Sequence, residues 1–371
     1  MTAITSLRLS HFRSHKALTL EADTRPVALY GPNGAGKTNI LEAVSLLSPG
    51  RGLRRAAAEE LIRRPEDIGW KITALAQAGA RHEIVTAVTA PGQRRSVEID
   101  GKATPQSALG EITPMVWLTP PMDRLWTEGA AERRRFLDRA TLSFEPGHGD
   151  RTLAYEKAMR ERNRLLKEGG ADPGWLSALE AQMAVAGAGL ARARAETVAR
   201  LTAAQAEAET AFPRADIGIE GAAEEGFAPL IAAGRDAREG EEAAEQALVR
   251  AFADGRRTDE YAGRTLNGPH RSDLTAVYAE KGVVAKSCST GEQKALLISL
   301  ILANARALRA ETGAPPILLL DEIAAHLDAD RRAALYEEII ALGAQAWMTG
   351  AGAELFEGLG ERGRIIEVVP E

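Results

Sequence analysis

The stretch GPNGAGKT at residues 31–38 decides the fold. It contains a glycine, four further residues and then Gly-Lys-Thr, which is the pattern of a phosphate-binding loop. The apolar residues VALY precede it, and GKTNILEAVSLLS forms a predicted helix after it, so the motif has the strand and the helix that it requires. A glycine-rich turn without function is the alternative, but it does not explain strand, motif and helix together. The pattern therefore predicts an α/β domain that binds ATP.

The residues of this loop have distinct expected roles. Gly31, Gly34 and Gly36 allow backbone N–H groups to face the phosphates. Lys37 is expected to reach the β- and γ-phosphates and to assist catalysis, and Thr38 to supply an oxygen ligand to Mg²⁺. The residues expected to contact ATP are Gly31, Pro32, Asn33, Gly34, Ala35, Gly36, Lys37 and Thr38.

A second motif, ILLLDE at residues 317–322, matches the first. Four apolar residues indicate a buried strand of a parallel sheet, and two carboxylates follow at its end. We expect Asp321 to hold Mg²⁺ and Glu322 to orient or deprotonate the attacking water as the catalytic carboxylate. An ordinary strand end with acidic residues in solvent is the alternative, and the pairing with the phosphate loop argues against it.

The composition limits the class of protein. The chain has 371 residues, of which 45% are hydrophobic and 26% charged, as in a packed globular protein. A single cysteine, Cys288, excludes an internal disulfide and suits a reducing compartment; we interpret it as a small buried apolar residue. The N-terminal residues show no signal peptide, and the most apolar stretch is interrupted by Asn304 and Arg306. We therefore expect a cytoplasmic protein without a membrane partner.

The chain changes character twice. Strands are predicted up to residue 118, helices dominate residues 128–262, and mixed structure returns after Gly263. Within the helical part, an alanine-rich apolar seam predicts close packing of one long helix along another, with Gly187 and Gly189 weakening its middle. The predicted plan is one ATPase domain built from residues 1–120 and 264–371, with a helical arm, residues 121–263, inserted between them.

The tract KSCSTGEQKALLISLIL at residues 286–302 precedes an apolar helix. Ser289 can cap this helix, and Glu292 can complete a capping box. Ser289, Gly291 and Glu292 also resemble the signature motif of the ATP-binding-cassette (ABC) superfamily, in the form used by its SMC-like DNA-repair branch. The resemblance implies that these residues contact the γ-phosphate of ATP bound to a second subunit. AHLD at residues 325–328 is similar to the D-loop of the superfamily, which implies that Asp328 lies near the dimer seam.

A further motif, HFRSH at residues 11–15, resembles the N-terminal motif of the SMC-like branch. This implies that Arg13 and Ser14 approach the nucleotide phosphates, although a solvated surface charge is an equal alternative for Arg13. The sequence departs from the pattern of the ABC superfamily at two places that concern catalysis. QAWMTGAGA offers Thr349 where transporters carry a histidine, and the glutamine loop is not identifiable. We therefore expect slow ATP hydrolysis.

The motifs together are similar to those of the RecF family of bacterial DNA recombination and repair proteins, over essentially the whole chain. GPHRSDL at residues 268–274 and GRGLRRA at residues 50–56 are specific to it, although Ser272 replaces a common aspartate. The resemblance implies an ABC-type, SMC-like head and an ATP-induced homodimer that binds DNA at gaps or junctions. It also implies that the protein works with RecR and RecO to load RecA in repair, replication restart and the SOS response. ATP would then serve mainly as a dimerisation switch of a slow, DNA-stimulated ATPase.

Local basic clusters are the candidate DNA contacts. A net charge of −6 excludes a surface that coats nucleic acid as a whole, but not a basic patch. Aromatic residues are only 5%, so arginine contacts to the backbone of duplex or single-stranded DNA, without sequence readout, are favoured over base stacking. Ordinary solvated helix faces are the alternative. The candidates are Arg51, Arg54, Arg55, Arg63 and Arg64, with Arg133, Arg134 and Arg135 as a second cluster.

Three other functions are open to an ATPase of this kind. A transporter-type ABC subunit predicts a switch histidine and a shorter helical insertion. A structural SMC-like protein predicts arms of hundreds of residues, and a nuclease predicts a further acidic metal cluster. The sequence shows none of these features.

Overall fold

The computed structural model describes residues 1–64, 66–169 and 172–370, except for the side chains of residues 325 and 326. It divides into two compact units. We call the first the head; it contains Met1–Asp123, Glu207–Pro213 and Ser289–Glu371. We call the second the arm; it contains Arg124–Ala206 and Arg214–Cys288.

A five-stranded parallel sheet forms the first layer of the head. Its strands are short, and the three central ones are almost wholly buried, as expected for strands that are covered on both faces. In sheet order they are β14 (Arg364–Glu367), β3 (Val27–Tyr30), β13 (Ala346–Gly350), β12 (Ile317–Leu320) and β8 (Met115–Leu118).

A six-stranded antiparallel sheet forms the second layer of the head. Buried and exposed residues alternate along its strands, so one face packs on the core. In sheet order the strands are β2 (His15–Glu21), β1 (Thr2–Phe12), β4 (Trp70–Ala78), β5 (Ala80–Val88), β6 (Ser96–Ile99) and β7 (Lys102–Ala103).

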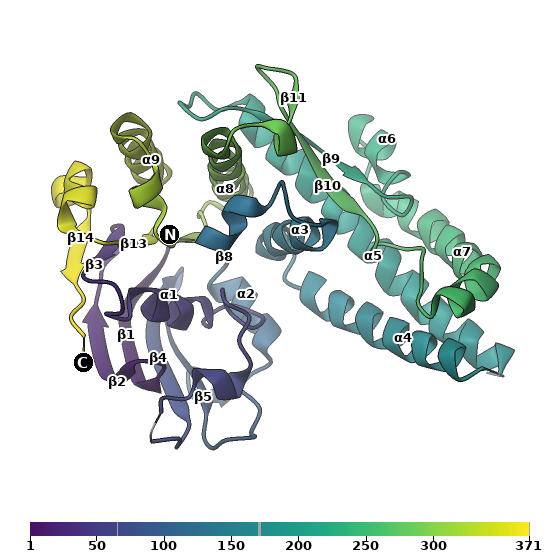
Figure 1. The fold of residues 1–371 in the computed structure, drawn as a ribbon, viewed down its shortest axis with the longest axis horizontal. Coiled ribbons are helices and arrows are strands. Elements are labelled where there is room, and N and C mark those ends of the chain that lie inside the picture. Colours follow the sequence, from purple (N-terminus) through teal and green to yellow (C-terminus); the bar gives the residue numbers. More distant parts are fainter. Residues whose placement is uncertain (65, 170–171, 371) are drawn as a thin grey trace. The chain divides into compact units, whose positions relative to one another are not determined.

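Helices complete the head. Helix α1 (Lys37–Ser45) contacts β1 of one sheet and β13 of the other, and one apolar core joins it to both. Figure 1 shows α8 (Thr290–Thr312) and α9 (Ala329–Leu342) on the opposite face of the parallel sheet. The short helix α2 (Leu109–Ile112) precedes β8. Strand β3 of the parallel sheet ends just before the phosphate loop, and α1 begins within it.

The arm is mainly helical. Its longest helix, α5, packs against α4 and α7. A small antiparallel sheet, in the order β11-β10-β9, completes it. The helices are α3 (Ala130–Phe144), α4 (His148–Glu168), α5 (Pro173–Ala206), α6 (Phe227–Ala232) and α7 (Glu241–Ala262). The strands are β9 (Ala215–Glu220), β10 (Asp273–Tyr278) and β11 (Val283–Val284).

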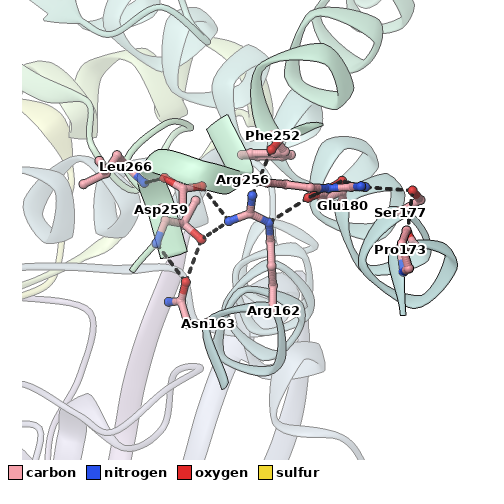
Figure 2. A network of polar contacts seen from close by, with 10 residues as sticks. Arg162, Asn163, Pro173, Ser177, Glu180, Phe252, Arg256, Asp259 and Leu266 are labelled. Carbon is pink, nitrogen blue, oxygen red and sulfur yellow. Dashed lines mark hydrogen bonds and ion pairs between the residues drawn. The ribbon is translucent and has the colours of Figure 1, made fainter. Parts of the chain in front are cut away.

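A buried ion-pair network centres on Arg162 of α4 (Figure 2). Its guanidinium donates to Glu180 of α5 at 3.0 Å and to Asp259 of α7 at 2.7 Å, and all three side chains are almost fully buried. It also donates to the Phe252 carbonyl oxygen at 2.9 Å, and Arg256 forms a second ion pair with Glu180. The network therefore ties three arm helices together through charged groups that would be costly to bury alone.

The structure differs from the sequence expectations at three places in the arm. Strand β9 lies within the stretch expected to be helical, and β10 pairs with it, so residues 264–288 belong to the arm and not to the head. Gly187 lies where a Cβ atom would come within 3.0 Å of Leu248 and 3.3 Å of Tyr155, so the absence of a side chain there permits close helix packing, a role that the helix propensity of glycine did not predict. Cys288 is partly exposed and is not the buried residue that we expected.

Candidate nucleotide site

The phosphate loop joins β3 to α1, and two of its glycines are dictated by the fold. Gly31 has φ 148°, and a Cβ atom there would lie 2.2 Å from the Val368 carbonyl oxygen. Gly36 has φ 93°, and a Cβ atom there would lie 2.6 Å from Oγ of Ser14. Since both contacts are far below van der Waals distance, only glycine fits at either position.

Lys37 is buried inside the loop. Its ammonium group donates to the carbonyl oxygens of Gly31 at 2.6 Å and of Pro32 at 3.0 Å. These contacts hold the charge beside the curled backbone. A phosphate bound in the loop would replace neutral acceptors with charged ones, which form the stronger hydrogen bonds.

The end of β12 brings the acidic motif to the loop. Oγ1 of Thr38 donates to Oδ1 of Asp321 at 3.0 Å, and Oγ1 of Thr349 on β13 donates to the same oxygen at 2.7 Å. Burial raises the pKa of Asp321, and the two hydroxyl hydrogen bonds oppose this shift. A hydroxyl and a carboxylate are hard oxygen donors of the kind that Mg²⁺ prefers, so this pair fits the ion that we predicted for it.

Glu322 follows in a left-handed conformation, with φ 54° and ψ 17°. Its backbone N–H donates to Oγ1 of Thr349 at 2.8 Å, and its side chain is half-buried. Residues other than glycine rarely adopt this conformation unless their surroundings enforce it. Such positions cluster at functional sites. The two acidic residues of the motif are therefore held by one threonine.

The two candidates on the N-terminal motif lie in different environments. Asn39 donates from Nδ2 to Oγ of Ser14 at 2.8 Å, so Ser14 lies against the start of α1. Arg13 instead donates from two nitrogens to the buried carboxylate of Glu42, both at 2.9 Å, and its side chain is 23% exposed. The structure thus places Arg13 as an anchor of α1, and the predicted contact of Arg13 with phosphate would require this pair to open.

The expected trans-acting residues lie at the ends of α8 and α9. Ser289 and Glu292 form the predicted capping box, in which the Ser289 N–H donates to Glu292 at 2.8 Å. Asp328 caps α9 by accepting from the Arg331 N–H at 2.8 Å. Ser289, Gly291 and Asp328 are exposed. The side chains of residues 325 and 326 in the expected D-loop lie outside the described residues.

The helix that begins at the signature segment packs on a strand that is distant in the sheet from the strand of the phosphate loop. Helix α8 contacts β8, which is separated from β3 by β13 and β12. Three strand spacings correspond to about 14 Å. This arrangement is compatible with contact between the signature and a nucleotide on another copy of the chain.

Comparison with known proteins identifies the family. The model of the RecF/RecN/SMC N terminal domain matches residues 3–365. The DNA replication and repair protein RecF of Rhizobium rhizogenes is 47% identical over 98% of this chain and 96% of its own length. That of Mesorhizobium japonicum is 48% identical over 99% and 96%. The chain belongs to the RecF family. The family is one of DNA replication and repair proteins, which confirms that part of the sequence prediction.

Solved structures confirm the fold. A structure of the recombination mediator protein RecF-ATP in the RecFOR pathway has a TM-score of 0.80 at 24% identity, over 95% of this chain and 92% of that one. An SMC head bound to the C-terminal winged-helix domain of ScpA has a TM-score of 0.51 at 16% identity, over 99% and 94%. The expected ABC-type, SMC-like head is therefore correct.

The basic cluster near α1 divides into two groups in this RecF-family member. Arg51, Arg55 and Arg64 are exposed. Arg54 donates to Oδ1 of Asn39 at 3.0 Å and lies 3.7 Å from Glu42, although its side chain is 45% exposed. Arg63 is less exposed and is paired with Glu66 at 3.3 Å. We therefore regard the first group as the more available for DNA.

Two residues that contact the site were not singled out from the sequence. Asn39 and Glu42 lie on α1, where they hold Ser14, Arg13 and Arg54. A polar residue on the buried face of an apolar helix was the available signal, since Glu42 is fully buried.

The described residues offer little for other kinds of site. Among the described residues, no group of three or more histidine, cysteine or acidic side chains could hold a metal ion. In that part of the chain, no helix combines the length and the hydropathy needed to cross a bilayer. The arrangement of Thr38 and Asp321 beside the phosphate loop therefore remains the candidate site for a magnesium nucleotide.

Proposed function

We propose that this RecF-family chain is an ATP-dependent, DNA-binding recombination mediator that uses ATP mainly as a dimerisation switch. The observation that carries the proposal is the hydrogen bond between Thr38 and Asp321 beside a phosphate loop shaped by Gly31 and Gly36. It brings the two nucleotide motifs of the family to one point. The relative solved as RecF-ATP supports the choice of nucleotide.

In the proposed mechanism, Lys37 leaves the carbonyl oxygens of the loop and binds the β- and γ-phosphates, while backbone N–H groups of the loop bind the remaining oxygens. Thr38 and Asp321 would hold Mg²⁺, and the ion would neutralise phosphate charge. Glu322 orients or deprotonates the attacking water. Hydrolysis is slow, because Thr349 in β13 cannot act as the general acid–base group that a histidine provides.

ATP on one subunit then becomes a ligand for a second subunit. Ser289, Gly291 and Glu292 at the start of α8 contact the γ-phosphate across the interface, and Asp328 lies at the seam. Ser289 and Gly291 are exposed, as this role requires. Helix N-termini favour anions because their backbone N–H groups are unpaired and their dipole is positive.

Dimerisation in turn gathers positive charge for DNA. Each subunit carries exposed Arg51, Arg55 and Arg64, and pairing would combine two such groups in one particle. The DNA would be bound through its phosphates without sequence readout. We further propose that the dimer acts at gaps or junctions with RecR and RecO to promote RecA loading; the RecFOR pathway named for the solved relative supports this step.

Light scattering with and without ATP and Mg²⁺, followed by addition of duplex DNA, tests the proposal. We expect a monomer without nucleotide, a dimer with ATP and Mg²⁺, and DNA binding by the dimer alone. Lys37→Ala should abolish both responses, because it removes the charge that binds the phosphates. A wild-type protein whose mass and DNA affinity do not change with ATP would contradict the proposal.

A further inference from the structure

Thr349 lies at the centre of the head, near the end of β13. It is fully buried and pairs in register with Leu29 of β3, the strand that leads into the phosphate loop. On its other side, β13 pairs with β12, whose last residue immediately precedes Asp321. Thr349 therefore stands between the strand of the phosphate loop and the strand of the two carboxylates.

The directions of its two hydrogen bonds follow from the chemistry of the partners. The backbone N–H of Glu322, 2.8 Å away, can only donate, so Oγ1 of Thr349 must accept from it. The single hydroxyl hydrogen of Thr349 is then available for Oδ1 of Asp321 at 2.7 Å. One hydroxyl group thus fixes the side chain of the first carboxylate and the backbone of the second.

The backbone that it fixes is an unusual one. Glu322 has a φ of 54°, a left-handed conformation that is unfavourable for an ordinary L-residue relative to the right-handed one. A hydrogen bond from its N–H to a buried, rigid acceptor stabilises this turn. It also prevents the N–H from being buried without a partner, which would be costly.

We propose that Thr349 is a positioning residue for ATP hydrolysis, which sets the orientation of Asp321 and the left-handed turn at Glu322 through a single hydroxyl group. This inference rests on the proposed ATPase function. Thr349 does not exchange protons with the reactants; it holds the two carboxylates that act on the metal ion and on water.

Replacing the threonine by valine keeps the shape and removes the hydroxyl. Asp321 would then lose one of its two hydroxyl donors, and the Glu322 N–H would lose its acceptor. The phosphate loop, Lys37 and Thr38 are untouched. A small displacement of catalytic groups is enough to reduce the rate of a chemical step by about 100-fold.

Three measurements on the full chain test the role of Thr349. In Thr349→Val, kcat for ATP hydrolysis should fall by about 10- to 100-fold, and the Mg²⁺ concentration for half-maximal rate should rise. ATP affinity without Mg²⁺ should stay within about threefold. Residue-resolved hydrogen exchange at the Glu322 amide should accelerate by at least about fivefold, relative to the Asp321 amide, which donates to the Leu118 carbonyl oxygen.

Two variants separate this role from a general loss of packing. Thr349→Ser retains the hydroxyl and should restore kcat and the protection of the Glu322 amide. Thr197→Val removes a hydroxyl from an equally buried threonine in α5, which donates to the Ala193 carbonyl oxygen, and should leave both unchanged.

The outcomes are distinguishable from those of the proposed function. The inference is wrong if the Glu322 amide of Thr349→Val exchanges at the wild-type rate, or if this variant keeps the wild-type kcat. It is also wrong if the variant loses ATP affinity by as large a factor as it loses kcat. A wild-type protein that neither binds nor hydrolyses ATP would overturn the proposed function itself, whereas the exchange measurement needs no nucleotide.

Discussion

Oγ1 of Thr38 lies 3.0 Å from Oδ1 of Asp321, although 283 positions separate the two residues in the chain. Thr38 lies in the first turn of α1 and Asp321 follows β12, and the entire arm lies between them in the sequence. Neither end of the chain can build the nucleotide site alone. Closing such a long loop costs only a few kcal/mol more than closing a short one, because the entropy depends on the logarithm of its length.

The first prediction concerns the carboxylate of Glu322. Glu322→Gln keeps the shape of the side chain and removes its basicity, so ATP hydrolysis should fall by about 100-fold or more. The ATP-bound dimer should persist, because phosphate and Mg²⁺ binding do not use this group. Dimer lifetime after removal of free ATP is measured by light scattering. A Glu322→Gln dimer that dissociates as fast as the wild type would assign the base to another residue.

The second prediction concerns the signature residue Ser289. Ser289→Arg places a long side chain at an exposed helix start that is expected to meet a second subunit. The variant should bind ATP with near wild-type affinity, since its own phosphate loop is intact, but should remain monomeric in light scattering. Ser96→Arg, at an exposed serine of β6 in the same unit, is the matched control. Normal dimerisation of Ser289→Arg with ATP would refute a role in trans.

Much of the head was predictable because its motifs are local. The phosphate loop, the acidic strand and the capping box of Ser289 each lie within a few consecutive residues, and each appears in the structure as the expected strand end or helix start. The contacts that position the residues around the site could not be predicted, because they join residues that are distant in the sequence. Arg13 lies in the turn between β1 and β2 and Glu42 lies on α1, and nothing in the sequence pairs one carboxylate with one arginine among many.

The arm shows the same limit. Its helices were evident from periodicity, but β9 was missed because a short strand has little pattern of its own and is stabilised by its pairing with β10. Gly187 was interpreted by helix propensity alone, whereas a side chain there would also come close to residues of α4 and α7. In both cases the missing information lies in tertiary packing, which local preference does not contain.

The third prediction concerns the stability of the arm. Arg162→Ala would leave the buried carboxylates of Glu180 and Asp259 without their shared guanidinium (Figure 2). Removing one partner of a buried ion pair typically costs about 3–5 kcal/mol. Arg164→Ala, on the same helix but with an exposed side chain, should cost less than about 1 kcal/mol. Urea unfolding, followed by a signal from the arm, gives the free energy of unfolding of both variants. Equal losses of free energy in the two variants would show that burial of the network contributes little to stability.

The last prediction concerns DNA. A protein with a net charge of −6 can bind a polyanion only where positive charge is locally concentrated. Of the five arginines near α1, Arg54 is committed in part to Asn39 and Glu42, so Arg51 and Arg55 provide the cleaner test. Each arginine contact with a DNA phosphate releases condensed counterions, and the slope of log affinity against log salt changes by about 0.9 per contact.

Duplex binding in the presence of ATP, measured by anisotropy across a salt series, should therefore give a shallower slope for Arg51→Ala/Arg55→Ala than for the wild type. The expected difference is about 1.8 for each subunit that contacts DNA. Arg235→Ala/Arg238→Ala removes two exposed arginines from the arm and is the matched control, with an unchanged slope. Changing the DNA sequence should have little effect, because phosphate contacts carry no sequence information. If the Arg51→Ala/Arg55→Ala slope equals that of the wild type, these arginines are a solvated surface and the DNA binds elsewhere on the protein.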